Sequence, residues 1–153
     1  MTLSSESAAS KRGITPFATF ESDFPDDSVE ERGDIVVPGG QNIMRAIYDC
    51  LARRGYRVSN FDQHSHYGWS FDLRGREGSF WLLVQYPGPW LLTVNDSRMV
   101  WSRIFGGRTA FASLLERCRA CLESIPQLRS ISWMSRKEYE TEFYRQMPQN
   151  KKA

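Results

Sequence analysis

Residues 69–94 read WSFDLRGREGSFWLLVQYPGPWLLTV, and this stretch decides the fold. Its first part, residues 69–74, alternates large apolar with polar side chains, which is typical of an antiparallel strand with one buried face. Residues 80–86 are almost continuously apolar and predict a central strand, and residues 90–94 predict a third strand. The segments between them are short and contain Gly or Pro. Three strands joined by such turns predict an antiparallel meander.

Two amphipathic helices are expected on either side of the meander. Residues 41–54 place their apolar side chains on one stripe and are followed by Gly55, and residues 109–125 repeat the pattern up to Pro126. The remaining expected elements are strands at 35–37, 56–61 and 128–134, a short helix at 99–104 capped by Asn95 and Asp96, and a terminal helix at 135–146 opened by a capping box of Ser135 and Glu138.

The order of these elements predicts an α+β fold. We expect an antiparallel sheet of about four to five strands with helices packed mainly on one face, because each amphipathic helix needs an apolar cover. The chain of 153 residues is long enough for one such domain. We assign residues 1–19 to a disordered leader, residues 20–147 to the domain and residues 148–153 to a frayed tail.

Charge is distributed unevenly along the chain. Residues 21–34 hold seven acidic side chains and one basic side chain, whereas residues 35–153 hold seventeen basic and ten acidic side chains. Three interpretations of this acidic segment, which we place at 20–34, stay open. It folds back over a basic face, it is held out for a basic partner, or it is a solvated leader that keeps the protein soluble.

The cysteines and the distribution of apolar residues indicate the cellular compartment in which the protein is expected. Cys50, Cys118 and Cys121 all fall on predicted helices without a nearby His, which predicts buried free thiols in a reducing compartment. Cys118 and Cys121 form a C-x-x-C late in a helix, whereas redox pairs stand at a helix start. No signal-peptide pattern and no stretch of ~18 apolar residues is present. We therefore expect a cytoplasmic protein.

No enzyme mechanism is favoured by the sequence. Phosphate loops, nucleophile elbows, dinucleotide fingerprints and zinc-protease motifs are absent, so we expect no catalytic residue, no metal ligand and no cofactor. The alternative is a small metal- or ligand-dependent enzyme that uses the loop around His64 and His66. An H-x-H pair in an extended segment places both imidazoles on one side, and Asp62 adds a carboxylate. A polar surface turn explains the same residues without a site.

Arginines provide a second alternative, a nucleic-acid-binding module. Guanidinium groups would hold phosphates while tryptophans stack on bases. A structural explanation of these residues competes with the nucleic-acid-binding interpretation. Arginines at helix ends complement the helix dipole, and the tryptophans stand at core-facing strand positions. The residues concerned are Arg53, Arg54, Arg57, Arg98, Arg103, Arg108, Arg117 and Arg119, with Trp69, Trp81, Trp90 and Trp101.

Five short motifs between Glu21 and Trp133 resemble small bacterial α+β proteins encoded beside polymorphic toxins. They are ESDFPDD at 21–27, RGY at 54–56, YGW at 67–69, FWLLV at 80–84 and WLL at 90–92. The resemblance implies an immunity-type protein, which is intracellular, has no chemistry of its own and covers the active site of a cognate toxin. Such proteins use charge complementarity for fast capture, and aromatic side chains commonly anchor interfaces. The predicted partner-binding residues are Asp23, Asp26, Asp27, Glu30, Glu31, Tyr67, Trp69 and Trp90.

Overall fold

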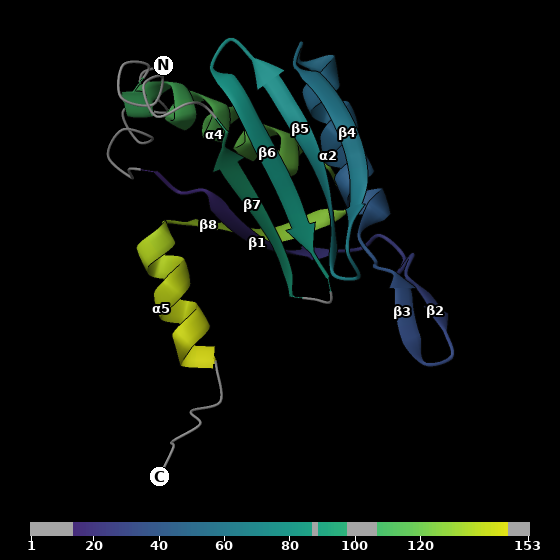
Figure 1. Ribbon diagram of the computed structural model, residues 1–153. Coiled ribbons are helices and arrows are strands. Elements are labelled where there is room, and N and C mark those ends of the chain that lie inside the picture. The colour runs from purple at the N-terminus through teal and green to yellow at the C-terminus, as the bar shows by residue number, and fades with distance from the viewer. Residues whose placement is uncertain (1–13, 87–88, 98–106, 147–153) are drawn as a thin grey trace.

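A six-stranded antiparallel sheet with three helices packed against it forms the described part of the protein (Figure 1). The computed structural model describes residues 14–86, 89–97 and 107–146. The strand order is β4-β5-β6-β7-β1-β8, and β2 and β3 form a separate two-stranded ribbon. The strands are β1 (Phe17–Ser22), β2 (Val29–Glu31), β3 (Asp34–Val37), β4 (Arg57–His64), β5 (Gly68–Gly75), β6 (Gly78–Gln85), β7 (Trp90–Asp96) and β8 (Leu128–Met134). The helices are α2 (Gln41–Arg53), α4 (Gly107–Ser124) and α5 (Arg136–Gln146).

The predicted meander is confirmed as β5, β6 and β7. Phe71 pairs with Leu82, and Leu82 pairs with Val94, so the three side chains form one row across the sheet. All three are at most 2% exposed. Burial of one such side chain contributes roughly 1.5–3 kcal/mol, which makes this row a main source of stability.

Helices α2 and α4 cover one face of the sheet (Figure 1). Ile47 of α2 and Leu114 of α4 are fully buried in the same core cluster. Helix α5 reaches the other face, because its Tyr139 ring stacks on Phe17, with ring centroids 4.4 Å apart. Side chains alternate along a strand, so Phe17 points away from the core side on which Ala18 lies. The α+β class is confirmed.

Strand β1 corrects the predicted strand count and the predicted leader. Residues 1–19 were expected to be disordered, but β1 begins at Phe17 and lies between β7 and β8. Both Phe17 and Ala18 are buried, so the strand lacks the apolar–polar alternation by which strands are recognised. With β1 and the ribbon the structure has six and two strands instead of four to five. The rest of the predicted leader lies outside the described residues.

A disulfide corrects the prediction of free thiols. Cys50 on α2 and Cys121 on α4 are bonded to each other, whereas Cys118 is free and buried. Burial, with Glu77 nearby, raises the pKa of the Cys118 thiol to about 12. The C-x-x-C motif is therefore not a redox pair, because its second cysteine is bonded to another helix.

The remaining helix predictions have mixed outcomes. The capping box is confirmed: the Ser135 N–H donates to Glu138 Oε1 at 3.0 Å and the Glu138 N–H donates to Ser135 Oγ at 3.1 Å. Asn95 and Asp96, the expected cap of the short helix, are the last residues of β7 and pair with Trp81 and Phe80. The predicted helix at 99–104 and the tail at 148–153 lie outside the described residues. Within the described ranges, no helix has the length and apolarity that a membrane span requires.

Candidate partner-binding site

The acidic segment, the β4–β5 turn and the end of β6 meet at one end of the sheet, where the β2–β3 ribbon projects (Figure 1). Two side-chain bonds hold the ribbon there. The Trp69 indole N–H donates to the carbonyl of Pro38 at 2.9 Å, and Gln63 Nε2 donates to the carbonyl of Val36 at 3.0 Å. The base of the ribbon is therefore attached to both β5 and β4.

Asp27 caps the N-terminus of helix α2. Its Oδ1 accepts the N–H of Gly40 at 2.8 Å, and its Oδ2 accepts the N–H of Asn42 at 2.8 Å. Gly40 precedes the helix at a φ of 99° and has no side chain with which to cap it. A carboxylate from thirteen residues earlier satisfies these free N–H groups and lies at the positive end of the helix dipole. Asp27 thus has a structural role, and its two oxygens are already used.

Asp26 stabilises the turn that leads into the ribbon. Its Oδ1 accepts the Ser28 N–H at 2.9 Å, and this backbone hydrogen bond is the main reason why the pKa of Asp26 is lowered. The Tyr86 hydroxyl donates to Ser28 Oγ at 3.3 Å and lies 3.5 Å from Asp26 Oδ2. The Tyr86 ring also packs on Gly39, where a Cβ atom would lie 2.7 Å from it. Tyr86 therefore joins the end of β6 to the acidic segment.

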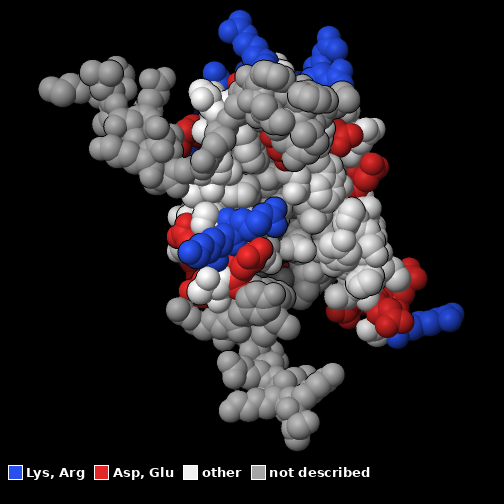
Figure 2. Space-filling model, turned by 60° about the vertical axis from the view of Figure 1, so that its left-hand side comes forward, with Lys and Arg blue, Asp and Glu red and all other residues white. Residues whose placement is uncertain are grey.

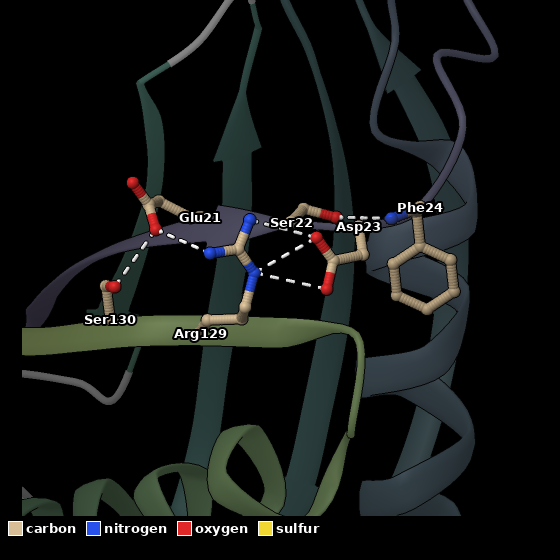
Figure 3. Close-up of polar contacts among 6 residues, drawn as sticks. All are labelled: Glu21, Ser22, Asp23, Phe24, Arg129 and Ser130. Carbon is tan, nitrogen blue, oxygen red and sulfur yellow. Dashed lines mark hydrogen bonds and ion pairs between the residues drawn. The ribbon is translucent and has the colours of Figure 1, made fainter.

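Asp23 and Glu21 bind Arg129 of β8 (Figure 3). The Arg129 Nη2 lies 2.9 Å from Asp23 Oδ1, and Nη1 lies 3.1 Å from Glu21 Oε2. The hydrogen bond that Arg129 donates to Asp23, followed by the charges of both carboxylates, raises the pKa of Arg129. Ser130 Oγ donates to the same Glu21 oxygen at 3.0 Å. Asp23 is consequently paired within the domain, and we no longer assign it to a partner.

Glu30 and Glu31 of the ribbon differ from the other predicted acids. Both are exposed, and within the described residues neither side chain forms an ion pair. Glu31 lies directly opposite Asp34 in the ribbon, so two negative charges face each other across the strands. Val29 and Val36 are 45% and 39% exposed on the same ribbon. Figure 2 shows carboxylates gathered at the lower right, on the side where Figure 1 places the ribbon.

The predicted aromatic residues do not share one environment. Trp69 is 8% exposed and belongs to the core, so it holds the ribbon and offers no ring to a partner. Tyr67 and Trp90 are half-buried at the end of the sheet. Tyr86, which the sequence did not single out as a site residue, lies between them: its N–H donates to the Tyr67 carbonyl at 2.6 Å, and its ring centroid is 5.7 Å from that of Trp90. The signal for Tyr86 was its place in the aromatic turn motif YPGPW.

The His64–His66 segment does not form the geometry proposed for a metal. His64 is the last residue of β4, but Ser65 has a φ of 55°, so the chain turns before His66. His66 Nδ1 instead lies 3.2 Å from Ser65 Oγ, and the His64 ring packs near Tyr67 and Trp81. In the described ranges, no group of three His, Cys, Asp or Glu side chains is placed to hold a metal ion.

The acidic segment has two parts. Its first part folds back onto the domain through Asp23 and Asp27, and its second part projects as the ribbon. Residues 29–37, with Glu30, Glu31, Asp34, Val29 and Val36, are called the acidic ribbon below. No protein-family model matches the chain, and comparison with curated proteins and with solved structures finds no match.

Proposed function

We infer that the protein is a non-catalytic binding protein, an immunity-type inhibitor that uses the acidic ribbon to cover the basic active site of a bacterial toxin. The motif resemblance supports the class of protein, and the acidic ribbon supports the location of the interface. The partner is expected to present Lys or Arg side chains around a small apolar contact.

One observation carries the proposal: Glu31 and Asp34 lie opposite each other, and among the described residues neither carboxylate forms an ion pair, not even with Arg32 of the turn that joins their strands. Like charges at directly opposed strand positions destabilise a pair of strands. A basic partner would remove this repulsion and add charge-assisted contacts with Glu30. Electrostatic attraction of this kind also accelerates association, which an inhibitor of a toxin needs.

Because the acidic ribbon is attached to the domain, it loses little conformational entropy when it binds a partner. The hydrogen bonds from Trp69 and Gln63 fix its base, and Asp27 fixes the segment that enters it. A binding element that is already ordered loses less conformational freedom on association than a free segment. Val29 and Val36 supply the exposed apolar area that a purely electrostatic contact would lack.

A charge-reversal pull-down tests the proposal. The wild-type chain, the variant Glu30→Lys/Glu31→Lys and the control Glu123→Lys/Glu140→Lys are tagged and incubated with lysate of the source cells. Nuclease treatment and a moderate-salt wash remove nucleic acid. Both variants change the net charge equally, and all four positions are exposed. We expect one stoichiometric partner that binds the wild type and the control, and a loss of at least tenfold with Glu30→Lys/Glu31→Lys.

The captured partner is then assayed with increasing amounts of the protein. Complete inhibition of its activity at a one-to-one ratio is expected for an immunity-type inhibitor. Equal capture by both variants would move the interface away from the ribbon. Recovery of nuclease-sensitive material alone would contradict the inhibitor function.

A further inference from the structure

Five exposed arginines gather at the end of the sheet opposite the acidic ribbon. They come from the end of α2, the start of β4, the end of β5 and the turn that follows it, which Figure 1 places together at the top of the molecule. Figure 2 shows basic side chains projecting at the top. The residues are Arg53, Arg54, Arg57, Arg74 and Arg76, and they are called the arginine end below.

Arg57 and Arg74 are direct cross-strand partners in the β4–β5 pair. Two guanidinium groups at opposed positions repel each other, which lowers the stability of this strand pair. In the described part of the chain, none of the five arginines forms an ion pair, and Arg74 makes a single hydrogen bond, from Nε to Ser79 Oγ at 3.3 Å. The arrangement leaves an excess of positive charge that is available to an anion.

The carboxylates nearest in sequence are engaged elsewhere. Asp72, two residues before Arg74, accepts a hydrogen bond from Asn60 Nδ2 at 2.6 Å. Glu77 in the neighbouring turn is 9% exposed at its side chain and pairs with Arg117 at 3.7 Å. With Asp49, one helical turn before Arg53, three carboxylates lie near five arginines in the sequence, so the arginine end keeps a net positive charge.

The backbone that carries the arginine end is held in place. The ring of Tyr56 packs against Gly75 between Arg74 and Arg76, where a Cβ atom would lie 2.5 Å from the ring. Tyr56 itself is 7% exposed, and its N–H donates to the carbonyl of Leu51 in α2 at 3.1 Å. The turn and the helix end thus share one support, which keeps the spacing of the arginines constant.

We propose that the arginine end binds the phosphate backbone of a nucleic acid, without reading its sequence. Guanidinium groups suit phosphate because they donate two parallel hydrogen bonds to it. Among the described residues of this end, Tyr56 is the one aromatic side chain and it is buried, so no ring is presented for stacking on a base. The absence of an exposed large apolar side chain among them argues against a protein partner or a membrane surface.

Fluorescence anisotropy with the full chain tests the proposal. The probe is a fluorescein-labelled single-stranded 20-nucleotide DNA or RNA of mixed sequence, titrated over a series of salt concentrations. Each phosphate contact contributes about −0.7 to the slope of log affinity against log salt for single strands, so five contacts would give about −3.5 at most. Arg57→Gln/Arg74→Gln is expected to weaken binding at low salt by about tenfold or more and to reduce the slope by about 1.4.

Arg45→Gln/Lys137→Gln is the matched control, because it removes the same charge from exposed positions outside both the arginine end and the acidic ribbon. We expect its affinity to stay within twofold of the wild type, and Arg57→Gln/Arg74→Gln to keep the thermal midpoint of the wild type or raise it. No binding by the wild type at low salt, or equal weakening by both variants, would overturn the proposal. So would equally strong competition by polyglutamate or by phosphatidylserine vesicles, which would indicate an acidic protein or a membrane as the ligand.

Discussion

At the scale of the residue, Asp27 carries the most distinct structural role among the acidic side chains. It is distant in sequence from the helix that it caps, and two backbone N–H groups depend on it. Loss of a helix cap typically costs about 1 kcal/mol. Asp27→Ala is therefore expected to lower the free energy of unfolding by about that amount, measured by chemical denaturation. Glu30→Ala is the control, and its effect should stay within about 0.5 kcal/mol because Glu30 is exposed and unpaired.

Glu138 gives a prediction that depends on pH. The backbone N–H and then the side chain of Ser135 lower the pKa of Glu138. Its ionised form therefore stabilises the start of α5 at pH values above the unfolded pKa of about 4.3, and this contribution is lost as the pH falls through the lower folded value. In an NMR titration we expect the pKa of Glu138 to lie below the value of a Glu in an unfolded chain, and Ser135→Ala to raise it part of the way because the backbone N–H is kept. An unlowered pKa of Glu138 in the wild type would contradict the capping box.

At the scale of the element, the disulfide joins the two helices that cover the sheet. Cys50 and Cys121 are 71 residues apart, and the chain-entropy model assigns about 4 kcal/mol to a closed loop of that length. Cys50→Ala/Cys121→Ala is expected to lower the free energy of unfolding by about 2–4 kcal/mol. Cys118→Ala keeps the bond and should cost about 1 kcal/mol.

Counting the free thiols of the protein tests whether the Cys50–Cys121 disulfide forms in cells. Alkylation of freshly lysed cells in denaturant should label one cysteine without reductant and three with it. Disulfides persist mainly in oxidising compartments, so this result would speak against the cytoplasmic location that we expect from the sequence. Labelling of all three cysteines without reductant would instead show that the bond is absent in the cell.

At the scale of the whole molecule, opposite charges occupy opposite ends of the sheet. Glu31 faces Asp34 at the ribbon, and Arg57 faces Arg74 at the other end. Two like-charge pairs at opposed strand positions lower stability locally, and both are explained if each end binds a partner of the opposite charge. Because the ends lie apart, a basic protein and a nucleic acid would bind without competing for the same surface (Figure 1).

Much of the fold was predictable because its signals are local. The alternation in 69–74, the apolar run in 80–86 and the stripe in 41–54 depend on neighbouring residues, and β8 and the capping box were confirmed for the same reason. Strand β1 was missed, because a central strand with Phe17 and Ala18 buried on opposite sides shows no period of two. Of the predicted site residues, Glu30 and Glu31 stay candidates, while Trp69 lies in the core.

The sequence by itself determined the α+β class, the meander, the amphipathic helices and the presence of an acidic segment before a basic domain. The tertiary structure alone decided which charges are paired and which are free. Asp23 and Arg129 meet across 106 residues, and Cys50 bonds to Cys121 rather than staying reduced. Local patterns fix the period of an element, but the partner of a side chain depends on how distant elements pack, and it is the unpaired charges at the two ends that define the candidate interfaces.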